Sequence, residues 1–468
     1  MPPLESQSPA VSATTSGAGV IGEGPASRFR GRTALRASPR SEAFVFWGPL
    51  IYLAASTIEG VLRFALAAVH LAPLLYLRDV FALVVVMWHL RMCLREGKLA
   101  GPLQTVLLLL VLWALVGFTY ASNVAQVFFG FKMFLPLMLG IASYPVVRAR
   151  IQSASRFILG LWLVAVCGLF ASALVRMPWV GESYELGGVE IEGSKEWGIS
   201  GADRLAGFSR ASFSVANQVL FFSVWIACFS RFRLVRLAVW FASASAIVLT
   251  TSRSALMGFA ATTAFLCLQS LAGSLHRVWK CLIPLAAILM VAVPVLPPSA
   301  FSFLEPFANG GRYRGPAASF FDRVDDTWPG AFEMVATAGN WLTGRGLGGI
   351  GMAQKYFEPD MNNPADNLFV YLFVIFGPAS IVLLGLIVLR MRCLYIPGDA
   401  TALHGACVGL GVIVVGITLN CVEDQCVSFF AGGLLCRLFG TRDARRRRPV
   451  RPRNEASPGG RMQAPGLG

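Results

Sequence analysis

The feature that most limits how this chain can fold is its series of long apolar segments. Windows of about 19 residues rich in apolar side chains recur along the chain, and polar residues gather between them. A helix needs roughly 20 apolar residues to cross the hydrocarbon core of a bilayer. We therefore expect an all-α, polytopic integral membrane protein with about 12 transmembrane helices. The expected spans are residues 43–58, 74–91, 102–120, 124–147, 157–175, 212–230, 237–251, 254–272, 281–299, 367–389, 401–419 and 426–440.

The composition agrees with this class of protein. Of 468 residues, 55% are hydrophobic and only 14% are charged, about half the charged share of a soluble protein. This excludes a soluble protein with a single core. The net charge of +15 is explained by membrane topology, and we expect no nucleic-acid partner. The chain has only four histidines, which argues against a histidine-rich metal site.

The basic residues predict the orientation, because cytoplasmic loops carry an excess of Lys and Arg. About two thirds of the 40 basic residues lie in alternate connections and near the two ends of the chain. Both termini are therefore predicted to be cytoplasmic. Residues 1–42 are rich in Ser, Pro, Ala, Gly and Arg and are expected to be a disordered tail rather than a cleavable signal peptide. Residues 441–468 are expected to be a basic cytoplasmic tail.

Two connections on the predicted outer side are long. Residues 176–211 interrupt the first nine spans (residues 43–300), and residues 301–366 separate spans nine and ten. The last three spans then occupy residues 367–440. Long loops are usually functional or disordered. Residues 328–341 suit a helix, so we expect the 301–366 loop to fold over the membrane mouth.

Several charged residues near the spans are candidate functional groups, because a charge at membrane depth costs several kcal/mol unless it faces a partner or a cavity. Arg253 lies in the hydroxyl-rich turn Thr251-Ser252-Arg253-Ser254. Its planar donors suit a diphosphate, and the alternative is an arginine that anchors a helix end. Arg204 and Arg210 precede a span, whose N-terminus attracts anions. Solvated loop arginines are the alternative for this pair.

Lys132 lies within the fourth span. It either faces a substrate cavity or forms a buried ion pair with an acid such as Asp79. Glu59 and Arg63, four residues apart, and the adjacent Arg78 and Asp79 are expected to be structural ion pairs.

Three further features leave alternatives open. Asp366 and Asn367 stand at the start of the tenth span. Asp366 is either a helix N-cap, or a general base or ligand for a sugar hydroxyl that faces a cavity. The glycine-rich segment 344–351 lacks the Lys-Ser/Thr of a nucleotide-binding loop, so its glycines are expected to permit a sharp helix exit. Cys421 and Cys426 flank a short polar segment and either form a disulfide or remain free thiols.

The order of these elements, from about residue 43 to 440, resembles the O-antigen ligase and O-antigen polymerase superfamily. The matching pieces, in chain order, are Glu59-Gly60 with Arg63, Arg78-Asp79, residues 204–208 with Asn217, Thr251-Ser252-Arg253-Ser254, residues 323–328, residues 344–348 and Asp366-Asn367. The resemblance implies an integral membrane glycosyltransferase that acts at the periplasmic face of the bacterial inner membrane. Its substrates would be glycans carried by undecaprenyl diphosphate.

One departure from that pattern favours a polymerase. In the ligases of this superfamily the large loop typically ends with a histidine beside the asparagine, whereas this chain has Asp366 there and no histidine from residue 277 to 403. The expected activity is polymerisation of lipid-linked repeat units for exopolysaccharide or O-antigen biosynthesis. The alternatives are an O-antigen ligase that transfers glycan to lipid A-core, and a transporter of a lipid-linked sugar without enzymatic activity.

The resemblance also assigns roles to residues. Arg204, Arg210, Arg253 and Lys132 would bind the diphosphate, and Arg253 would also stabilise charge as the glycosidic bond breaks. Asp366 would be the catalytic base. The secondary candidates are Arg323, Asp325, Glu333, Arg345 and Asn367. No metal, nucleotide or other cofactor is expected, because the donor already carries its leaving group. The implied partners are the lipid bilayer and other polysaccharide assembly and export proteins.

Overall fold

The structure is a computed structural model, and the residues that it describes all belong to one compact unit. It describes residues 39–97, 100–121, 123–186, 189–192, 198–199, 202–268, 275–308, 317–396 and 398–440. The predicted C-terminal tail and almost all of the predicted N-terminal tail lie outside the described residues.

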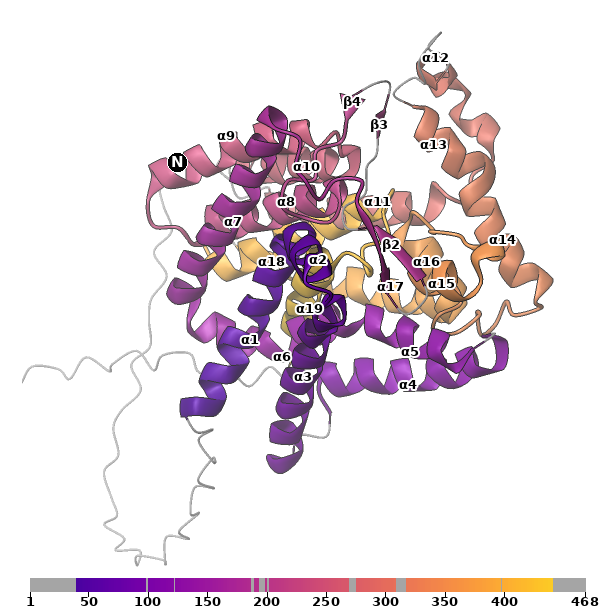
Figure 1. The fold of residues 1–468 in the computed structure, drawn as a ribbon, viewed down its shortest axis with the longest axis horizontal. Helices are drawn as coiled ribbons and strands as arrows, with labels where there is room; N and C mark the ends of the chain where they lie inside the picture. Colours follow the sequence, from indigo (N-terminus) through magenta and orange to yellow (C-terminus); the bar gives the residue numbers. More distant parts are fainter. Residues whose placement is uncertain are drawn as a thin grey trace, which may run out of the picture. The chain divides into compact units, whose positions relative to one another are not determined.

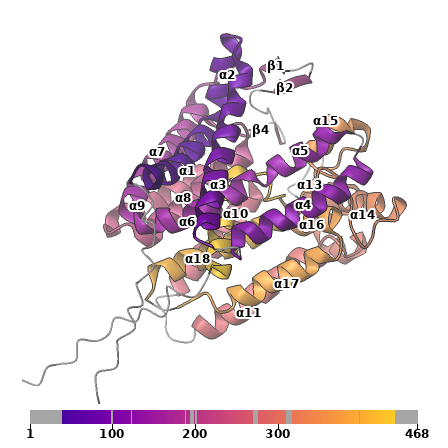
Figure 2. The same cartoon turned by 90° about the horizontal axis from the view of Figure 1, so that it is seen from below.

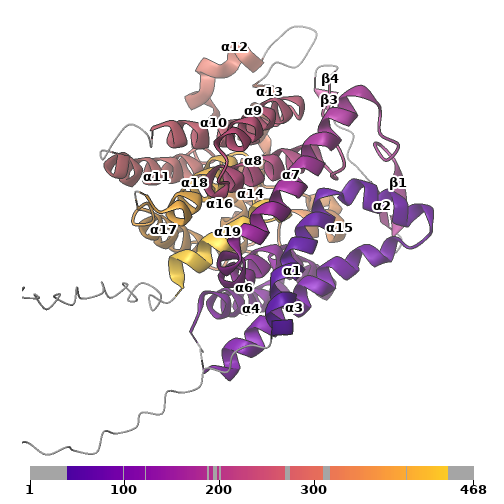
Figure 3. The same ribbon diagram turned by 90° about the vertical axis from the view of Figure 1, so that its left-hand side faces the viewer.

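The first half of the described chain is a series of mostly apolar helices (Figure 1). In order they are α1 (Pro39–Thr57), α2 (Glu59–Ala68), the short 3-10 helix η1 (Ala72–Tyr76), α3 (Leu77–Arg95), α4 (Pro102–Tyr120), α5 (Val124–Met133), α6 (Leu135–Ala149) and α7 (Ile151–Leu174). Helix α1 packs along α3 and α6 (Figure 3). Between α1 and α2 the chain bends by 77°.

In the second half, a run of short helices lies between two groups of longer ones. In order these are α8 (Ser212–Phe229), α9 (Arg233–Leu249), α10 (Arg253–Leu268), α11 (Leu275–Ala292), η3 (Pro298–Leu304), α12 (Glu305–Ala308), α13 (Ala318–Asp322), the π-helical turn η4 (Arg323–Thr327), α14 (Trp328–Thr337), α15 (Met352–Phe357), η5 (Pro359–Met361), α16 (Leu368–Phe376), α17 (Ala379–Met391), α18 (Ala400–Gly416) and α19 (Gln425–Phe439). Helices α11 and α17 lie side by side (Figure 2).

The predicted helical fold is confirmed, and several of its helices are apolar enough to span a membrane. Each predicted apolar segment coincides with a helix or with two consecutive helices. In the described part of the chain, five helices are long and apolar enough to cross a membrane, or six if α1 and α2 form one bent span. Several apolar side chains on these helices face outward, such as Leu108 and Leu115 on α4, which are 61% and 59% exposed. Outward apolar side chains suit contact with lipid.

Two predicted spans are interrupted in the structure. Phe134 separates α5 from α6, and Pro136 is the second residue of α6. Residues 377–378 separate α16 from α17, because Gly377 has a left-handed backbone (φ +59°) and a proline follows it. A side chain at Gly377 would also meet the backbone of Leu342 and Gly344. The absence of a side chain at this break therefore allows the glycine-rich segment 344–351 to pack closely against α16.

The connection 176–211 contains two short pairs of antiparallel strands, which were not predicted from the sequence. They are formed by β1 (Ser183–Leu186) with β2 (Val189–Glu192), and by β3 (Gly198–Ile199) with β4 (Ala202–Asp203).

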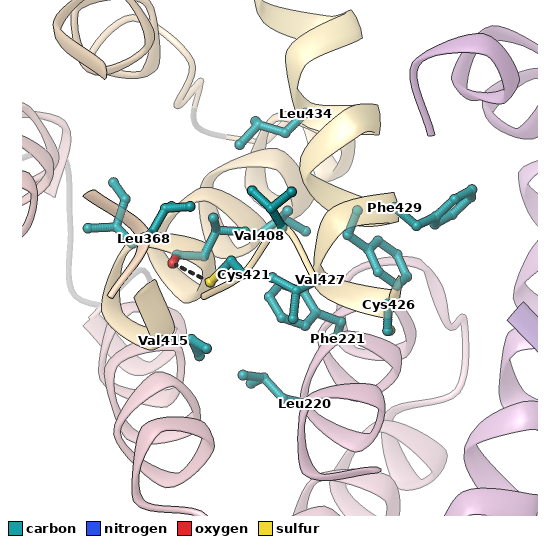
Figure 4. Close-up of a cluster of buried hydrophobic side chains, with 14 of the residues drawn as sticks. Leu220, Phe221, Leu368, Val408, Val415, Cys421, Cys426, Val427, Phe429 and Leu434 are labelled. Atoms are coloured by element: carbon teal, nitrogen blue, oxygen red, sulfur yellow. Dashed lines mark hydrogen bonds between the residues drawn. The ribbon is translucent and has the colours of Figure 1, made fainter. Parts of the chain in front are cut away.

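Helices α8, α18 and α19 form the centre of the core. Phe221 stacks on Phe430 with ring centroids 5.6 Å apart. Cys421 and Cys426 lie in this cluster as free thiols, and the Cys421 thiol donates to the Val412 carbonyl at 3.6 Å (Figure 4). The structure thus favours the free-thiol alternative. Against α6, α19 packs so closely that a side chain at Gly140 or Gly432 would meet the opposite backbone, as is common between membrane helices.

Candidate functional site

A cavity of about 380 Å³ collects charged residues from segments that are far apart in the sequence. Four arginines and four carboxylates line it: Arg204, Arg210, Arg253, Arg323, Glu59, Asp366, Glu423 and Asp424. The two predicted catalytic residues and three of the four predicted diphosphate-binding residues therefore meet in one place. We call this the arginine cavity.

Arg253 reaches the arginine cavity from a constrained turn. Thr251, which precedes it by two residues, has a positive φ of +53°, an unfavourable conformation for a β-branched residue. The Thr250 hydroxyl stabilises this turn by donating to the Ile247 carbonyl at 2.6 Å and accepting from the Ser252 backbone at 3.2 Å. Arg253 is then the first residue of α10. A strained turn that is held this firmly is typical of functional sites.

Ser319, on the short helix α13, connects Arg253 to the ion pair of Arg323 and Asp366. The Arg253 guanidinium donates to the Ser319 hydroxyl at 3.2 Å, and Arg323 donates to the Ser319 carbonyl at 3.0 Å. Arg323 also donates through Nε to Asp366 Oδ2 at 2.9 Å. Segment 317–366 of the predicted large loop thus contributes directly to the arginine cavity.

The N-cap interpretation of Asp366 is wrong. The cap of α16 is Asn367, whose side-chain oxygen accepts from the Val370 backbone at 3.0 Å. Ala365 and Asp366 both have positive φ values, +62° and +42°. This backbone leaves the Asp366 side chain at the cavity, where it is paired with Arg323 and 30% exposed.

The arginines are close enough to affect one another. Burial, and then the neighbouring charges of Arg253 and Arg323, lowers the pKa of Arg204 from its ordinary value. This repulsion between like charges falls when an anion binds among them. An anionic group is therefore suited to the space among these three arginines.

The polar segment between α18 and α19 contributes two acidic residues, Glu423 and Asp424, to the arginine cavity. Neither was predicted from the sequence to be a site residue. Asp424 caps α19 by accepting from the Val427 backbone at 3.0 Å, and Asn217 donates to it at 3.1 Å. Burial nevertheless raises the pKa of the Asp424 carboxyl to about 6. Glu423 accepts from the Met352 backbone at 2.8 Å. The signal in the sequence was the polar run 423–425 between two apolar segments.

Two buried polar groups also line the arginine cavity. Ser209 is 1% exposed and Gln218 is 3% exposed. Their Oγ and Oε1 atoms have no hydrogen-bond partner among the described residues. Buried polar atoms are almost always satisfied by protein, water or ligand. The lining is therefore suited to a polar ligand.

A chain of ion pairs runs beside the arginine cavity and ends at Lys132. Glu59 contacts Arg63 at 2.6 Å and Arg78 at 3.0 Å, Arg78 contacts Asp79 at 3.3 Å, and Lys132 Nζ lies 2.8 Å from Asp79. The predicted Glu59–Arg63 and Arg78–Asp79 pairs are confirmed. Lys132 pairs with Asp79, which was the alternative predicted for it from the sequence. It lines a neighbouring cavity rather than the arginine cavity.

The ion-pair chain predicts a large loss of stability when its central carboxylate is neutralised. We expect Glu59→Gln to destabilise the protein by about 3–5 kcal/mol, because it leaves Arg63 and Arg78 buried beside an uncharged group. Thermal unfolding of the purified variants, monitored by size exclusion, measures this loss of stability. Glu305→Gln, which alters an exposed carboxylate on α12, is the matched control. Equal unfolding temperatures for the two variants would show that the chain of ion pairs contributes no stability.

The remaining secondary candidates lie away from the arginine cavity. Asp325 and Glu333 are exposed and do not line it. Arg345 pairs with Glu358 at 3.0 Å and donates to the Gly349 carbonyl at 3.0 Å, which holds the glycine-rich segment in place. Asn367 is fully buried as the α16 cap. The geometry gives Arg345 and Asn367 structural roles.

The glycine-rich segment packs against other backbone. Arg345 and Gly346 donate from their backbones to the Val374 and Ile375 carbonyls at 2.7 and 3.1 Å, and the Leu347 backbone donates to Trp113 at 3.1 Å. Its glycines therefore serve close packing against α16 and α4. Among the residues that the structure describes, no three His, Cys, Asp or Glu side chains are grouped so as to hold a metal ion.

Comparison of the chain with protein-family models, curated proteins and solved structures finds no match.

Proposed function

We propose that this protein is an integral membrane polysaccharide polymerase, which transfers a glycan from undecaprenyl diphosphate to another lipid-linked repeat unit. The observation that carries the proposal is the meeting of Arg204, Arg210, Arg253 and Arg323 with Asp366 in one cavity. Arginine is well suited to phosphate because its donors are planar and permanently charged. The resemblance to the O-antigen polymerase superfamily, stated from the sequence, agrees with this chemistry.

In the proposed reaction an acceptor hydroxyl oxygen attacks the anomeric carbon of the donor sugar. A new glycosidic bond forms as the bond between that carbon and the diphosphate oxygen breaks. The hydroxyl proton passes to Asp366, and undecaprenyl diphosphate leaves among the arginines. Arginine donors near the leaving oxygens stabilise the charge that develops there. Arg323, 2.9 Å from Asp366, holds this carboxylate at the wall of the arginine cavity.

The proposal includes a topology of 12 spans in the bacterial inner membrane, with both termini cytoplasmic and residues 301–366 periplasmic. Several helices in the described chain are shorter than 18 residues. In this topology they cross with the help of adjoining turns or in a locally thinned bilayer. The arginine cavity, which includes Ser319 and Arg323 of that loop, then lies toward the periplasm.

Reporter fusions test this topology. We expect a phosphatase that folds only in the periplasm to be active when fused after Gly339, and inactive when fused after Arg231 in the turn between α8 and α9. The physical reason is the excess of basic residues in that turn. A cytoplasmic fluorescent reporter at the same two sites should give the opposite pattern. Activity of the phosphatase at Arg231 alone would reverse the proposed orientation.

Reconstitution tests the activity itself. The purified protein in lipid vesicles receives the lipid-linked repeat extracted from cells that lack it, and glycan length and free undecaprenyl diphosphate are measured. A polymerase gives a ladder of lengths and releases about one undecaprenyl diphosphate per bond formed. Transfer only to added lipid A-core would establish the ligase alternative. Movement of the lipid-linked sugar across the bilayer without release of undecaprenyl diphosphate would establish the transporter alternative.

A further inference from the structure

A second cavity, of about 260 Å³, adjoins the arginine cavity. The two share four lining residues: Arg210, Met352, Glu423 and Gln425. We call this second one the aromatic cavity. Since its walls include part of the arginine cavity's walls, a group bound here lies next to a ligand bound there.

The lining of the aromatic cavity combines ring faces with charged hydrogen-bonding groups. Its rings are Tyr52, Tyr76, Phe129, Tyr356 and Phe357. Phe129 on α5 and Tyr356 on α15 meet edge to face, with centroids 5.3 Å apart. Lys132 Nζ lies 4.4 Å from the centroid of the Tyr76 ring and 2.8 Å from Asp79. Aromatic rings and charged groups thus face the same small space.

This combination matches the surface of a sugar ring. A pyranose presents apolar C–H groups on its faces and hydroxyls around its edge, so it binds where an aromatic face adjoins charged donors and acceptors. The volume lies just below the roughly 300–1,000 Å³ of pockets for drug-sized ligands. That size suits one sugar unit rather than a lipid chain.

We propose that the aromatic cavity binds the terminal sugar of the acceptor glycan. This inference rests on the proposed function and adds a second subsite to it. The acceptor hydroxyl lies at the wall shared by Arg210 and Glu423, and its oxygen reaches the anomeric carbon of the donor in the arginine cavity. The Lys132–Asp79 pair bonds to the other hydroxyls, which assigns these two residues to acceptor binding.

Phe129 offers a test with a matched control on the same helix. Phe129→Leu removes the ring face but keeps most of the volume, and Phe129→Tyr keeps the ring. The control is Phe128→Leu, because Phe128 is 65% exposed, packs on Phe118 and lines neither cavity. The probe is the free oligosaccharide released by mild acid from the lipid-linked repeats of cells that lack the protein. Its binding to each purified variant is measured by equilibrium dialysis, and undecaprenyl diphosphate binding is measured in parallel.

We expect Phe129→Leu to weaken oligosaccharide binding about fivefold or more, with unchanged affinity for undecaprenyl diphosphate. Phe129→Tyr and Phe128→Leu should bind both ligands as the wild type does. Wild-type oligosaccharide affinity in Phe129→Leu would overturn the inference, as would equal weakening for both ligands. Failure of the proposed function has a different signature, in which the wild-type protein does not bind undecaprenyl diphosphate and no lipid-linked repeats accumulate without it.

Discussion

Asp366→Asn should leave the protein at normal abundance and abolish long-chain polysaccharide. Asparagine tolerates the positive φ that Asp366 adopts, and the cap of α16 is Asn367, so the backbone and the helix are preserved. A neutral amide cannot accept the proton of the acceptor hydroxyl, and loss of a general base typically slows a reaction about 10²- to 10⁴-fold. Single undecaprenyl-linked repeats should accumulate, as measured by lipid extraction and gel analysis of polysaccharide length.

Asp325→Asn is the matched control for this variant. Asp325 lies in the same outer segment but is exposed and does not line the arginine cavity, so chain length should be unchanged. Wild-type chain length in Asp366→Asn would remove Asp366 from catalysis. Accumulation of finished chains that are not attached to lipid A-core would instead support the ligase alternative.

Arg253→Lys should also cause a severe loss of polymer, although it keeps the positive charge. Lysine lacks the planar arrangement of donors that can hold a diphosphate while also contacting Ser319. Removal of one donor that stabilises developing charge typically costs about 10²- to 10³-fold in rate. The measurements are the rate of undecaprenyl diphosphate release in vesicles and the affinity of the purified protein for undecaprenyl diphosphate.

Arg231→Lys provides the comparison, because Arg231 is an exposed arginine in the turn between α8 and α9. It should release undecaprenyl diphosphate at the wild-type rate. If Arg253→Lys and even Arg253→Ala did the same, Arg253 would be an anchor for the start of α10. The diphosphate role of the arginine cavity would then depend on the other arginines alone.

One signal for candidate residues in the sequence was a charge beside an apolar segment. Arg204, Arg210, Arg253 and Asp366 were selected on that basis, and all four line one cavity. Arg345 and Asn367 were also candidates, but both make structural bonds. Arg345 donates to the nearby Gly349 carbonyl, and Asn367 donates to the distant Met290 and Ile417 carbonyls. A residue with such partners has the same appearance in a sequence as one that faces a ligand.

The assignment of the α16 cap shows the limit of local signals. Asp366 and Asn367 are adjacent, and both residue types are good N-caps. The conformation of the preceding loop determines which of the two caps α16. In this loop Asn363 donates to the Thr327 carbonyl at 2.7 Å and accepts from the Ala365 backbone at 2.8 Å. These bonds accompany the left-handed backbone of Ala365 and Asp366, and Asn367 rather than Asp366 is the N-cap of the helix.

The sequence by itself determined the helical, membrane-type class of the protein and its nearest-neighbour ion pairs. Apolar segments long enough to span a bilayer determine the class. Charges four residues apart on one helix, such as Glu59 and Arg63, determine the local ion pairs. Only the tertiary structure decided which distant groups meet, as with Arg253 and Ser319, 66 residues apart, or Arg323 and Asp366, 43 apart. A local pattern constrains contacts within a few turns of helix, whereas these contacts depend on how helices and loops from the whole chain pack together.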